Sequence, residues 1–509
     1  MESPAPDRLA VAVASGVAVV AGTFLLTGFT PRWVVVALAQ TVILLLPDAL
    51  IASGIQGLGS TAQPLLVAGS GLLAVALFAA IALLATRFGR GADRERAETV
   101  FLVAAVQTLA AFLLTITPGA AVLGGALGGA TVGLAGARAT DPVSGPDRRG
   151  LLRSAGVATV AVAAAGAGPL ARAVRAATTP ADTRGDADPD PLVERLLAVA
   201  EERSFELAGA EPLVSESFYV VDKNPADPRV DADEWTLSVT GAVDEAVEVN
   251  LDDLRSRTAQ HRFETLRCVG DPVNGRKMDT ALWTGVPVSS LLAEAGVDDE
   301  GCCVMLRAAD DYYEEFPLSA LEDGLLAWGM NGRPLPRGHG APVRALIPGH
   351  WGEINVKWLT EIEVLTEEAT GYWEQKGWHG TGPASTVAKI HHVETREDGA
   401  VTVGGHAYAG TRGVSAVEVS TDGGNTWATA EVTERLPGAT PADADPESTE
   451  AVGGAAVDAW RGWRHEYVAD GEHEVVVRAV ERDGTVQPSA ETDPFPSGAS
   501  GWVRRSVDP

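Results

Sequence analysis

The sequence predicts a protein of three parts, and one pattern in each part supports the division. Residues 1–178 contain a series of long uncharged stretches, which are typical of an all-α transmembrane bundle of about six helices. Residues 211–384 mix short alternating strands with short helices, the pattern of an α+β domain. Residues 385–509 contain strands at the intervals of an all-β sandwich. Residues 179–210 join the first two parts as a Pro-rich polar linker and a short helix.

Five stretches reach the roughly 20 apolar residues that a helix needs to cross a bilayer. They are residues 9–29, 33–53, 65–86, 99–117 and 119–137, and Asp48 is their one charged residue. A sixth, residues 154–171, is shorter and rich in Ala and Gly. A soluble bundle is the alternative, but such stretches have no polar face for water.

The loop arginines predict which way these helices cross. Arg32 marks the first loop, and the third and fifth loops are also rich in arginine, whereas the second and fourth have no Lys or Arg. Loops rich in basic residues stay in the cytoplasm. Six spans therefore predict a multi-pass protein of the cell membrane with an extracytoplasmic C-terminal part.

The segment before the last predicted span resembles a twin-arginine export signal. It reads Asp147-Arg148-Arg149-Gly150-Leu151-Leu152-Arg153 and precedes a mildly apolar run. Such signals export proteins that have already folded and bound a cofactor. Plain topogenic charge explains the arginine pair equally well, and Ala171-Arg172-Ala173 leaves cleavage open.

The two halves of the chain carry opposite net charge. Residues 1–178 hold 12 of the 39 basic and 8 of the 68 acidic residues, which leaves 27 basic against 60 acidic for the rest. This surplus argues against nucleic acid as a partner, since phosphates need Lys and Arg to neutralise them. With five lysines in the whole chain, the surface fits a high-salt environment that screens self-repulsion. An ordinary acidic secreted domain is the alternative.

Histidine usage bears on electron transfer in the membrane half. All nine histidines lie at position 261 or later, so the predicted spans offer no imidazole. Histidine is the usual axial ligand of membrane haem. We therefore expect no haem there, and the spans serve as an anchor or docking unit.

Local patterns predict the elements of the soluble half. Residues 192–207 have helical spacing, residues 236–239 and 246–249 alternate as strands, and residues 288–295 form a helix with Ser289 near its N-cap. Residues 437–456 form an acidic insertion that we expect to be mobile. Cys302 and Cys303 are expected to be buried thiols, because a bond between neighbours would be strained.

One soft thiol is followed by spaced cationic side chains. The motifs are Thr265-Leu266-Arg267-Cys268-Val269-Gly270-Asp271, Trp283-Thr284-Gly285-Val286-Pro287, His339-Gly340-Ala341-Pro342-Val343-Arg344 and Val356-Lys357-Trp358. A thiolate suits a soft metal ion, and Arg267 beside it should lower the thiol pKa. Residues 325–359 contain four Arg or Lys and two His against one acid, which predicts an anion pocket. A lone cysteine without these neighbours would be a structural thiol.

This ordered set resembles the sulfite oxidase family of molybdenum enzymes, from about residue 217 to the C-terminus. The resemblance implies that Cys268 ligates molybdenum held by a pterin dithiolene. The segment Asp422-Gly423-Gly424-Asn425-Thr426-Trp427 and its flanking strands resemble the family's immunoglobulin-like dimerisation domain, which implies a homodimer.

The resemblance also assigns the other site residues. It implies cofactor-binding roles for Tyr219, Val221, Asp222, Lys223, His339, Arg344, Asn355, Val356 and Lys357. It implies catalytic or pocket-lining roles for Cys268, Arg267, Asp310, Tyr312 and Trp378.

Two residues of this sequence differ from those of the sulfite oxidase family at matching positions. Lys223 stands where the animal enzymes have an arginine, and Trp378 stands where sulfite oxidases have a tyrosine near the metal. The loss of that phenol puts sulfite in doubt as the substrate. The haem domain of the animal enzymes is also missing, so a separate cytochrome or copper protein must carry the electrons.

The sequence thus predicts an extracytoplasmic, membrane-anchored molybdopterin oxidoreductase that moves an oxygen atom and two electrons to or from a small oxyanion or sulfoxide-type substrate. A sulfoxide reductase of the same superfamily is the nearest alternative. A non-catalytic surface adhesion or sensing protein is another. A transporter is disfavoured, because Asp48 is the one charged residue within a span.

Overall fold

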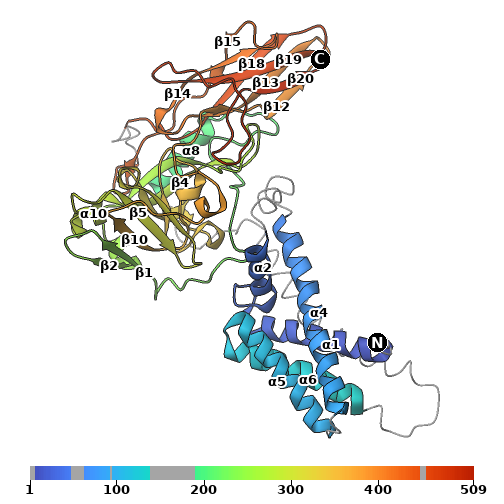
Figure 1. Ribbon diagram of the computed structural model, residues 1–509. Helices are drawn as coiled ribbons and strands as arrows, with labels where there is room; N and C mark the ends of the chain where they lie inside the picture. The colour runs from blue at the N-terminus through green and yellow to red at the C-terminus, as the bar shows by residue number, and fades with distance from the viewer. Residues whose placement is uncertain (1–5, 47–61, 92–94, 138–189, 447–453) are drawn as a thin grey trace. The chain divides into compact units, whose positions relative to one another are not determined.

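The computed structural model describes residues 6–46, 62–91, 95–137, 190–446 and 454–509 (Figure 1). The chain forms two compact units. One comprises Met1–Thr179 with Asp222–Arg229, and the other comprises Pro180–Val221 with Val230–Pro509. The first unit is helical and the second is built mainly of strands.

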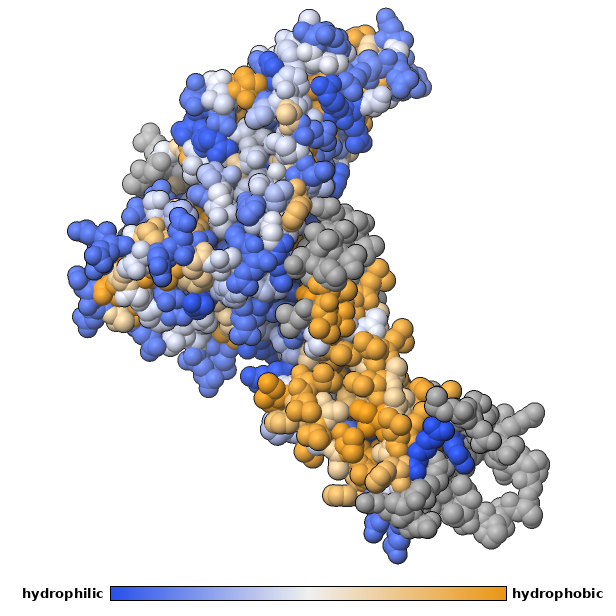
Figure 2. All heavy atoms as spheres, in the orientation of Figure 1, coloured by the Kyte–Doolittle hydropathy of each residue, from blue (hydrophilic) through white to orange (hydrophobic). Residues whose placement is uncertain are grey.

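The helical unit contains five described helices. They are α1 (Pro6–Thr27), α2 (Val34–Leu45), α4 (Ala62–Gly91), α5 (Arg96–Thr115) and α6 (Pro118–Ala137). Three contain segments long and apolar enough to cross a membrane, namely Arg8–Thr27, Pro64–Gly89 and Ala97–Thr115. The apolar parts of α2 and α6 are shorter, Val34–Ile43 and Pro118–Leu134. Figure 2 shows apolar residues gathered over the surface of these helices.

These helices confirm part of the predicted bundle. Three of the first five predicted spans are helices of sufficient length, and the other two are apolar helices that fall short of it within the described residues. The sixth predicted span, residues 154–171, and the arginine pair before it lie outside the described residues.

Small residues allow the helices of this unit to pack closely. A Cβ added at Gly22 would lie 2.9 Å from Cα of Gly124, so α1 and α6 touch through their backbones. Gln107 is fully buried and donates to the Phe78 carbonyl at 3.0 Å, which satisfies its amide inside the bundle. The segment Asp222–Arg229 belongs to this unit through Ala226, which packs in the cluster of Phe29 and Trp33.

The second unit begins with α8 (Pro191–Arg203), which confirms the helix predicted over residues 192–207. Asp190 caps it by accepting from the Leu192 N–H at 2.9 Å, and Pro191 occupies the first helical position. The other short helices are α9 (Leu251–Arg255), α10 (Ser289–Ala295), α11 (Leu318–Leu321), η2 (Arg337–His339), η3 (Gly352–Ile354), η4 (Glu374–Lys376) and η5 (Gly410–Arg412).

Two sheets form the middle of the chain. The first has the order β2-β1-β10-β5-β6, and β1 and β10 are its parallel pair. Its strands are β1 (Thr236–Gly241), β2 (Val247–Asn250), β5 (Cys303–Ala308), β6 (Tyr313–Pro317) and β10 (Leu359–Leu365). The second has the order β17-β3-β4-β7-β8, with β9 beside β7. Its strands are β3 (Gln260–Arg267), β4 (Met278–Pro287), β7 (Leu325–Met330), β8 (Arg333–Pro334), β9 (Arg344–Leu346) and β17 (Thr440–Pro441).

Aliphatic residues of both sheets join in one core. Leu237, Val239, Leu306 and Ile362 of the first sheet pack with Val286 and Leu326 of the second. Burial of such side chains stabilises by about 1.5–3 kcal/mol each. A second cluster holds the end of β3, after which Cys268 follows, because Leu266 packs there with Trp283 and with Leu346 of β9, the strand that begins at Arg344.

The C-terminal part consists of two antiparallel sheets, as the all-β prediction requires. One has the order β11-β13-β18-β16 with β12 beside β13, and the other has the order β15-β14-β19-β20. Contacts of β11 with β19 and of β13 with β14 hold the sheets together. The strands are β11 (Val387–Ala388), β12 (His392–Thr395), β13 (Ala400–Tyr408), β14 (Val414–Ser420), β15 (Ala428–Thr429), β16 (Glu431–Val432), β18 (Arg461–Val468), β19 (His473–Glu481) and β20 (Val503–Val507).

The helix predicted over residues 288–295 is α10, and Ser289 is its first residue, next to the Val288 N-cap, although no side chain caps the helix. Two other local predictions need correction. The acidic insertion is partly ordered, since Thr440 and Pro441 pair with His261 and Gln260. Cys302 and Cys303 are joined by a disulfide where the chain enters β5, before the regular alternation of side chains begins.

Candidate active site

Cys268 directly follows β3, at the point where the strand turns away from its neighbour. Its N–H donates to the Lys277 carbonyl at 2.9 Å, and its carbonyl accepts from the Asp271 N–H at 3.0 Å. Burial raises the pKa of the Cys268 thiol to about 11, against the lowering effect of Lys277. The cofactor-free protein therefore holds Cys268 as a thiol, ready to lose its proton to a metal.

A buried ion pair fixes the turn after Cys268. Asp271 and Lys389 are both completely buried, and Lys389 Nζ donates to Asp271 Oδ2 and to the Gly275 carbonyl. The other oxygen of Asp271 accepts from the Lys277 N–H at 2.9 Å. Lys389 lies just after β11, so the C-terminal strands help to hold the Cys268 turn.

The basic set converges as predicted. Arg344, at the start of β9, is 4% exposed and donates to the His339 carbonyl at 3.1 Å and to the Asn355 carbonyl at 3.0 Å. Lys357 donates to the Gly338 carbonyl at 3.0 Å and to the Val221 carbonyl at 3.1 Å. Both cations lower the pKa of His339, after burial, to about 3. His339 is therefore neutral at physiological pH.

Tyr219 links Cys268 to the basic set. Its N–H donates to Asp279 Oδ2 at 2.8 Å, and its ring stacks on Phe218, which meets the His339 ring edge-on at 5.4 Å. The pKa of its phenol is raised by burial, then by Cys268 and Asp279, while Arg344 lowers it. The phenol thus lies within electrostatic reach of both Cys268 and Arg344.

Two glycines keep this region open for a ligand. A Cβ at Gly352 would lie 2.9 Å from the Tyr219 hydroxyl and 3.3 Å from the Arg267 carbonyl. Gly340 has φ +109°, and its Cβ would lie 2.9 Å from Lys357 Cβ and 3.1 Å from Arg344 Cβ. A larger residue at either position would push the site residues apart.

Arg267 interacts electrostatically with Cys268 but does not give the thiol the lowered pKa that was predicted. It is completely buried, and its guanidinium donates to the Ser385 carbonyl at 2.9 Å and the Ala499 carbonyl at 3.1 Å. The guanidinium also lies 4.8 Å from the Trp351 ring. The prediction of a lowered thiol pKa is therefore wrong for the cofactor-free protein, because burial dominates and successive strand residues point to opposite faces.

Asn355 and Val356 organise the site through the fold. The Asn355 side chain accepts from the Ile347 N–H at 2.7 Å and donates to the Trp351 carbonyl at 2.9 Å. The Val356 N–H donates to Ile354, and its carbonyl accepts from Ala345. Their backbone contacts to a cofactor stay a prediction, and in the structure the Asn355 carbonyl accepts from Arg344 and helps to position it.

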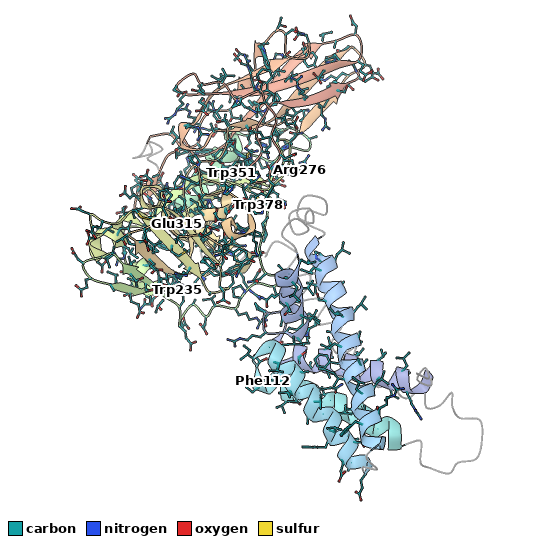
Figure 3. The ribbon with its side chains drawn as sticks, viewed as in Figure 1. Phe112, Trp235, Arg276, Glu315, Trp351 and Trp378 are labelled. Carbon is teal, nitrogen blue, oxygen red and sulfur yellow. A yellow bond between two sulfur atoms is a disulfide. The ribbon has the colours of Figure 1, made fainter. Side chains whose placement is uncertain are left out.

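The remaining predicted site residues of the strand-rich unit are buried or half-buried: Asp310, Tyr312 and Trp378. Asp310 accepts from the Tyr312 N–H at 3.1 Å, and the Tyr312 hydroxyl donates to the Glu353 carbonyl at 2.9 Å. Trp378, labelled in Figure 3, is 4% exposed, and its ring meets the Phe495 ring edge-on at 5.1 Å. Val221 contacts Lys357, whereas Asp222 and Lys223 belong to the helical unit.

Sequence reasoning missed four residues of this site: Asp271, Lys277, Asp279 and Lys389. Burial raises the pKa of Asp279 to about 7, against the hydrogen bonds that it accepts from Tyr219 and Ser215. The scarcity of lysine was the available signal, since two of the five lysines adjoin Cys268.

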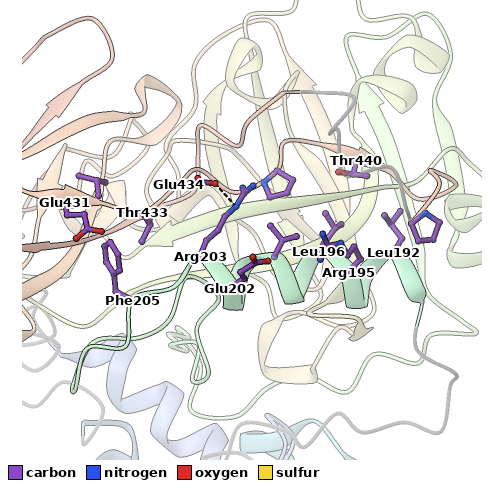
Figure 4. A pocket seen from close by; sticks show the side chains of 14 residues that line it. Leu192, Arg195, Leu196, Glu202, Arg203, Phe205, Glu431, Thr433, Glu434 and Thr440 are labelled. Carbon is purple, nitrogen blue, oxygen red and sulfur yellow. Dashed lines mark ion pairs between the residues drawn. The ribbon is translucent and has the colours of Figure 1, made fainter.

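A groove elsewhere in this unit is separate from the Cys268 region. It has a volume of about 470 Å³ and lies between α8 and the segment around β16, where Arg203 and Glu434 form an ion pair of 3.4 Å (Figure 4). The predicted site residues do not line it.

Comparison with known proteins bears on the cofactor. The oxidoreductase molybdopterin-binding domain matches residues 224–373, and the Mo-co oxidoreductase dimerisation domain matches residues 384–495. The chain is 31% identical to the sulfite oxidase of Gallus gallus over 327 residues, which cover 68% of that protein and 54% of this chain. The chain belongs to the sulfite oxidase family.

Other members of the sulfite oxidase family match a similar stretch. The mitochondrial sulfite oxidase of Homo sapiens is 29% identical over 358 residues, which are 59% of this chain and 63% of the human one. The chain thus spans somewhat less than two thirds of that relative. The NADH nitrate reductase of Solanum lycopersicum is 26% identical over 319 residues, 48% of this chain and 35% of that enzyme. The sulfane dehydrogenase SoxCD of Paracoccus pantotrophus aligns with a TM-score of 0.47 at 19% identity, covering 65% of this chain and 92% of that one.

The cofactor of the sulfite oxidase family is molybdenum bound to molybdopterin, and the residues present fit it. Cys268 supplies one soft sulfur, which molybdenum prefers. Arg344, Lys357 and neutral His339 supply the hydrogen-bond donors and positive charge that a pterin phosphate needs.

The low pKa of His339 predicts a loss of stability in acid. The unfolded chain protonates this histidine near pH 6.5, whereas the folded cofactor-free chain does so near 3. The free energy of unfolding therefore falls as the pH falls through this window, by about 2 kcal/mol between pH 6.5 and 5.

Urea unfolding of cofactor-free His339→Gln should show a smaller loss between these pH values than the wild type shows. Buried His391 and His406 also have lowered pKa values but are present in both proteins, so the difference isolates His339. Equal losses in the two proteins would contradict the assigned pKa.

Proposed function

We propose that the protein is an extracytoplasmic, membrane-anchored molybdopterin oxidoreductase that transfers an oxygen atom and two electrons between its cofactor and a small substrate. The convergence of Cys268 and the Arg344–Lys357–His339 set around Tyr219 carries the proposal. When bound, the molybdenum cofactor supplies the oxygen-atom and two-electron chemistry.

The protein residues supply binding and orientation. Cys268 is the protein ligand of the metal, on a turn that the buried Asp271–Lys389 pair holds rigid. Arg344 is fixed by two carbonyls and contributes its positive charge to the cofactor site, while Lys357 contributes a point charge beside His339. Tyr219 provides a buried, neutral phenol next to the thiol.

The proposal has two versions, which differ in the substrate and in the direction of the reaction. Sulfite oxidation is supported by the similarity to the sulfite oxidases of Homo sapiens and Gallus gallus. Reduction of a sulfoxide-type group is favoured by Trp378, which occupies the place of the family's tyrosine and is buried against Phe495. An indole cannot share a proton as a phenol does.

Membrane anchoring is supported by three helices long and apolar enough to span a bilayer. The arginine-rich loops support an extracytoplasmic position for the oxidoreductase part. We propose a soluble cytochrome or copper protein as the electron carrier. The match to a Mo-co dimerisation domain supports a homodimer, and the strands of that region support an immunoglobulin-like sandwich.

Two dye assays on the detergent-extracted full chain test the proposal. Ferricyanide reduction by sulfite reports the oxidase direction, and oxidation of reduced viologen by methionine sulfoxide reports the reductase direction. We expect turnover in at least one assay, with none in Cys268→Ser. A molybdenum-loaded protein that is inactive in both assays would contradict this substrate range, and a protein without molybdenum would support the non-catalytic alternative.

A further inference from the structure

Three carboxyl groups from three separate elements meet on one wall of the strand-rich unit. Glu314 comes from β6, Glu353 from η3 and Glu374 from η4. One oxygen from each lies within 4.8 Å of the others. We call this set the glutamate triad.

The triad receives few hydrogen bonds from the rest of the protein. Glu314 is completely buried, and its Oε2 accepts from the Trp373 N–H at 3.5 Å and shares the single Tyr312 hydroxyl proton with the Glu353 carbonyl. The other five carboxyl oxygens of the triad are buried and have no donor outside the triad among the described residues. Buried acceptors without partners are costly, so a group of them needs a specific ligand or protons.

Glu353 points to a ligand independently of the clustering. It is only 8% exposed, it arrives from the 3-10 turn after Trp351, and it is directed at the two other carboxyl groups. Both of its side-chain oxygens lack a donor outside the triad among the described residues, although its own carbonyl accepts from Tyr312 at 2.9 Å. Burying the Glu353 carboxyl group without hydrogen-bond donors from the rest of the protein is therefore energetically unfavourable.

Glycines make room for the carboxyl groups. A Cβ at Gly371 would lie 1.3 Å from Glu314 Oε1, and a Cβ at Gly380 would lie 2.0 Å from Glu353 Oε2. The backbone at both positions therefore borders the triad. Without a ligand, burial and the neighbouring glutamates raise the pKa of Glu314 to about 11 and that of Glu353 to about 9.

A cation and bound protons are the two ways to relieve such a cluster. Protons shared among three carboxyl groups provide few donors for the five free oxygens. A hard cation contacts all three groups at once and offsets their charge. Three carboxyl groups from separate elements suit the flexible, all-oxygen coordination of Ca²⁺, whereas Mg²⁺ needs strict octahedral geometry and keeps several of its waters.

We propose that Glu314, Glu353 and Glu374 bind one Ca²⁺-sized divalent cation. The site lies next to the Cys268 turn, because a Cβ at Gly380 would also lie 3.1 Å from Val269 Cγ2. A bound cation ties η3 and η4 to β6 and so stiffens the wall formed by Tyr312 and Trp373. The proposal is independent of the oxidoreductase function.

The test measures thermal unfolding and calorimetric binding on the chelator-treated full chain in detergent. Ca²⁺ is titrated at about 1 M KCl, which screens weak binding to the acidic surface. The wild type is compared with Glu353→Gln, Glu374→Gln and a matched control, Glu315→Gln, whose residue neighbours the triad in sequence (Figure 3). Glutamine preserves the size of the side chain and removes its charge, so the variants are expected to fold.

We expect one equivalent of Ca²⁺ to bind and raise the melting temperature of the wild type and of Glu315→Gln. Affinity should fall at least ~10-fold in Glu353→Gln and Glu374→Gln, since each loses a charged ligand. Mg²⁺ should give a smaller shift. An unshifted wild type, an equal shift in all four proteins, or a larger shift with Mg²⁺ would each overturn the proposal.

Discussion

Replacing Cys268 with serine is expected to abolish turnover while leaving the protein folded. The thiol lies where β3 ends, within electrostatic reach of Tyr219, and its backbone is held by Lys277 and Asp271. Serine keeps these backbone bonds but replaces the soft sulfur with a hard oxygen. We expect activity to fall at least ~100-fold, because changes even to residues outside a metal's ligand shell cost 10–100-fold.

The control for this variant replaces the two other cysteines of the chain. Cys302 and Cys303 form a disulfide at the start of β5 and have no part in the proposed site. The double variant Cys302→Ser, Cys303→Ser should keep its molybdenum and its turnover. Cys268→Ser with wild-type turnover and metal content would remove Cys268 from the mechanism.

Lys389→Met should destabilise the protein strongly. Lys389 and Asp271 are completely buried and paired, and the pair joins the strand β11 region to the turn after Cys268. Burial lowers the pKa of Lys389 to about 8, so the pair is still ionic at neutral pH. Removing Lys389 leaves the buried Asp271 carboxylate with Arg267, at 3.8 Å, as its remaining cationic partner, so we expect a loss of at most about 3–5 kcal/mol, the cost of a broken buried pair. Urea or thermal unfolding at pH 7 measures the loss.

The matched control neutralises both partners. Asp271→Asn combined with Lys389→Met removes both charges of the pair, and the amide oxygen of the new side chain can still accept from the Lys277 N–H and lie near Arg267, which pairs with Asp271 at 3.8 Å. The double variant should therefore be more stable than Lys389→Met alone. A double variant that loses the sum of both single losses would show that the two side chains act separately.

The order of local motifs made much of the site predictable. Cys268 follows an alternating strand, and His339, Arg344 and Lys357 stand in short motifs whose spacing suits an anion pocket. Their convergence in the structure confirms that these motifs belong together. The apolar stretches likewise predicted the helical unit, because length and absence of charge are directly visible in the sequence.

Contacts between buried residues that lie far apart in the sequence could not be predicted. Lys389 reaches Asp271 across 118 residues, and nothing in either local sequence indicates the pair. Asp279, which fixes the Tyr219 backbone, reads as an ordinary polar residue of a strand. The glutamate triad is similar, since its members lie on β6, η3 and η4 and meet only in the folded chain.

Arg267 shows how adjacency in sequence can mislead. It neighbours Cys268, but the alternation of strand side chains turns its guanidinium toward the Ser385 and Ala499 carbonyls. Lys277, on the neighbouring stretch of chain, is the cation that lowers the thiol pKa. Spatial neighbours across a turn, rather than sequence neighbours, set the electrostatics of the site.

Molybdenum X-ray absorption on the native, detergent-extracted protein tests the central claim most directly, because it counts the sulfur atoms bound to the metal. The wild type should contain molybdenum and pterin, and Cys268→Ser should show one sulfur neighbour fewer at the metal. The same sulfur count in both proteins, or no molybdenum in the wild type, would contradict the assignment of Cys268 as the metal ligand.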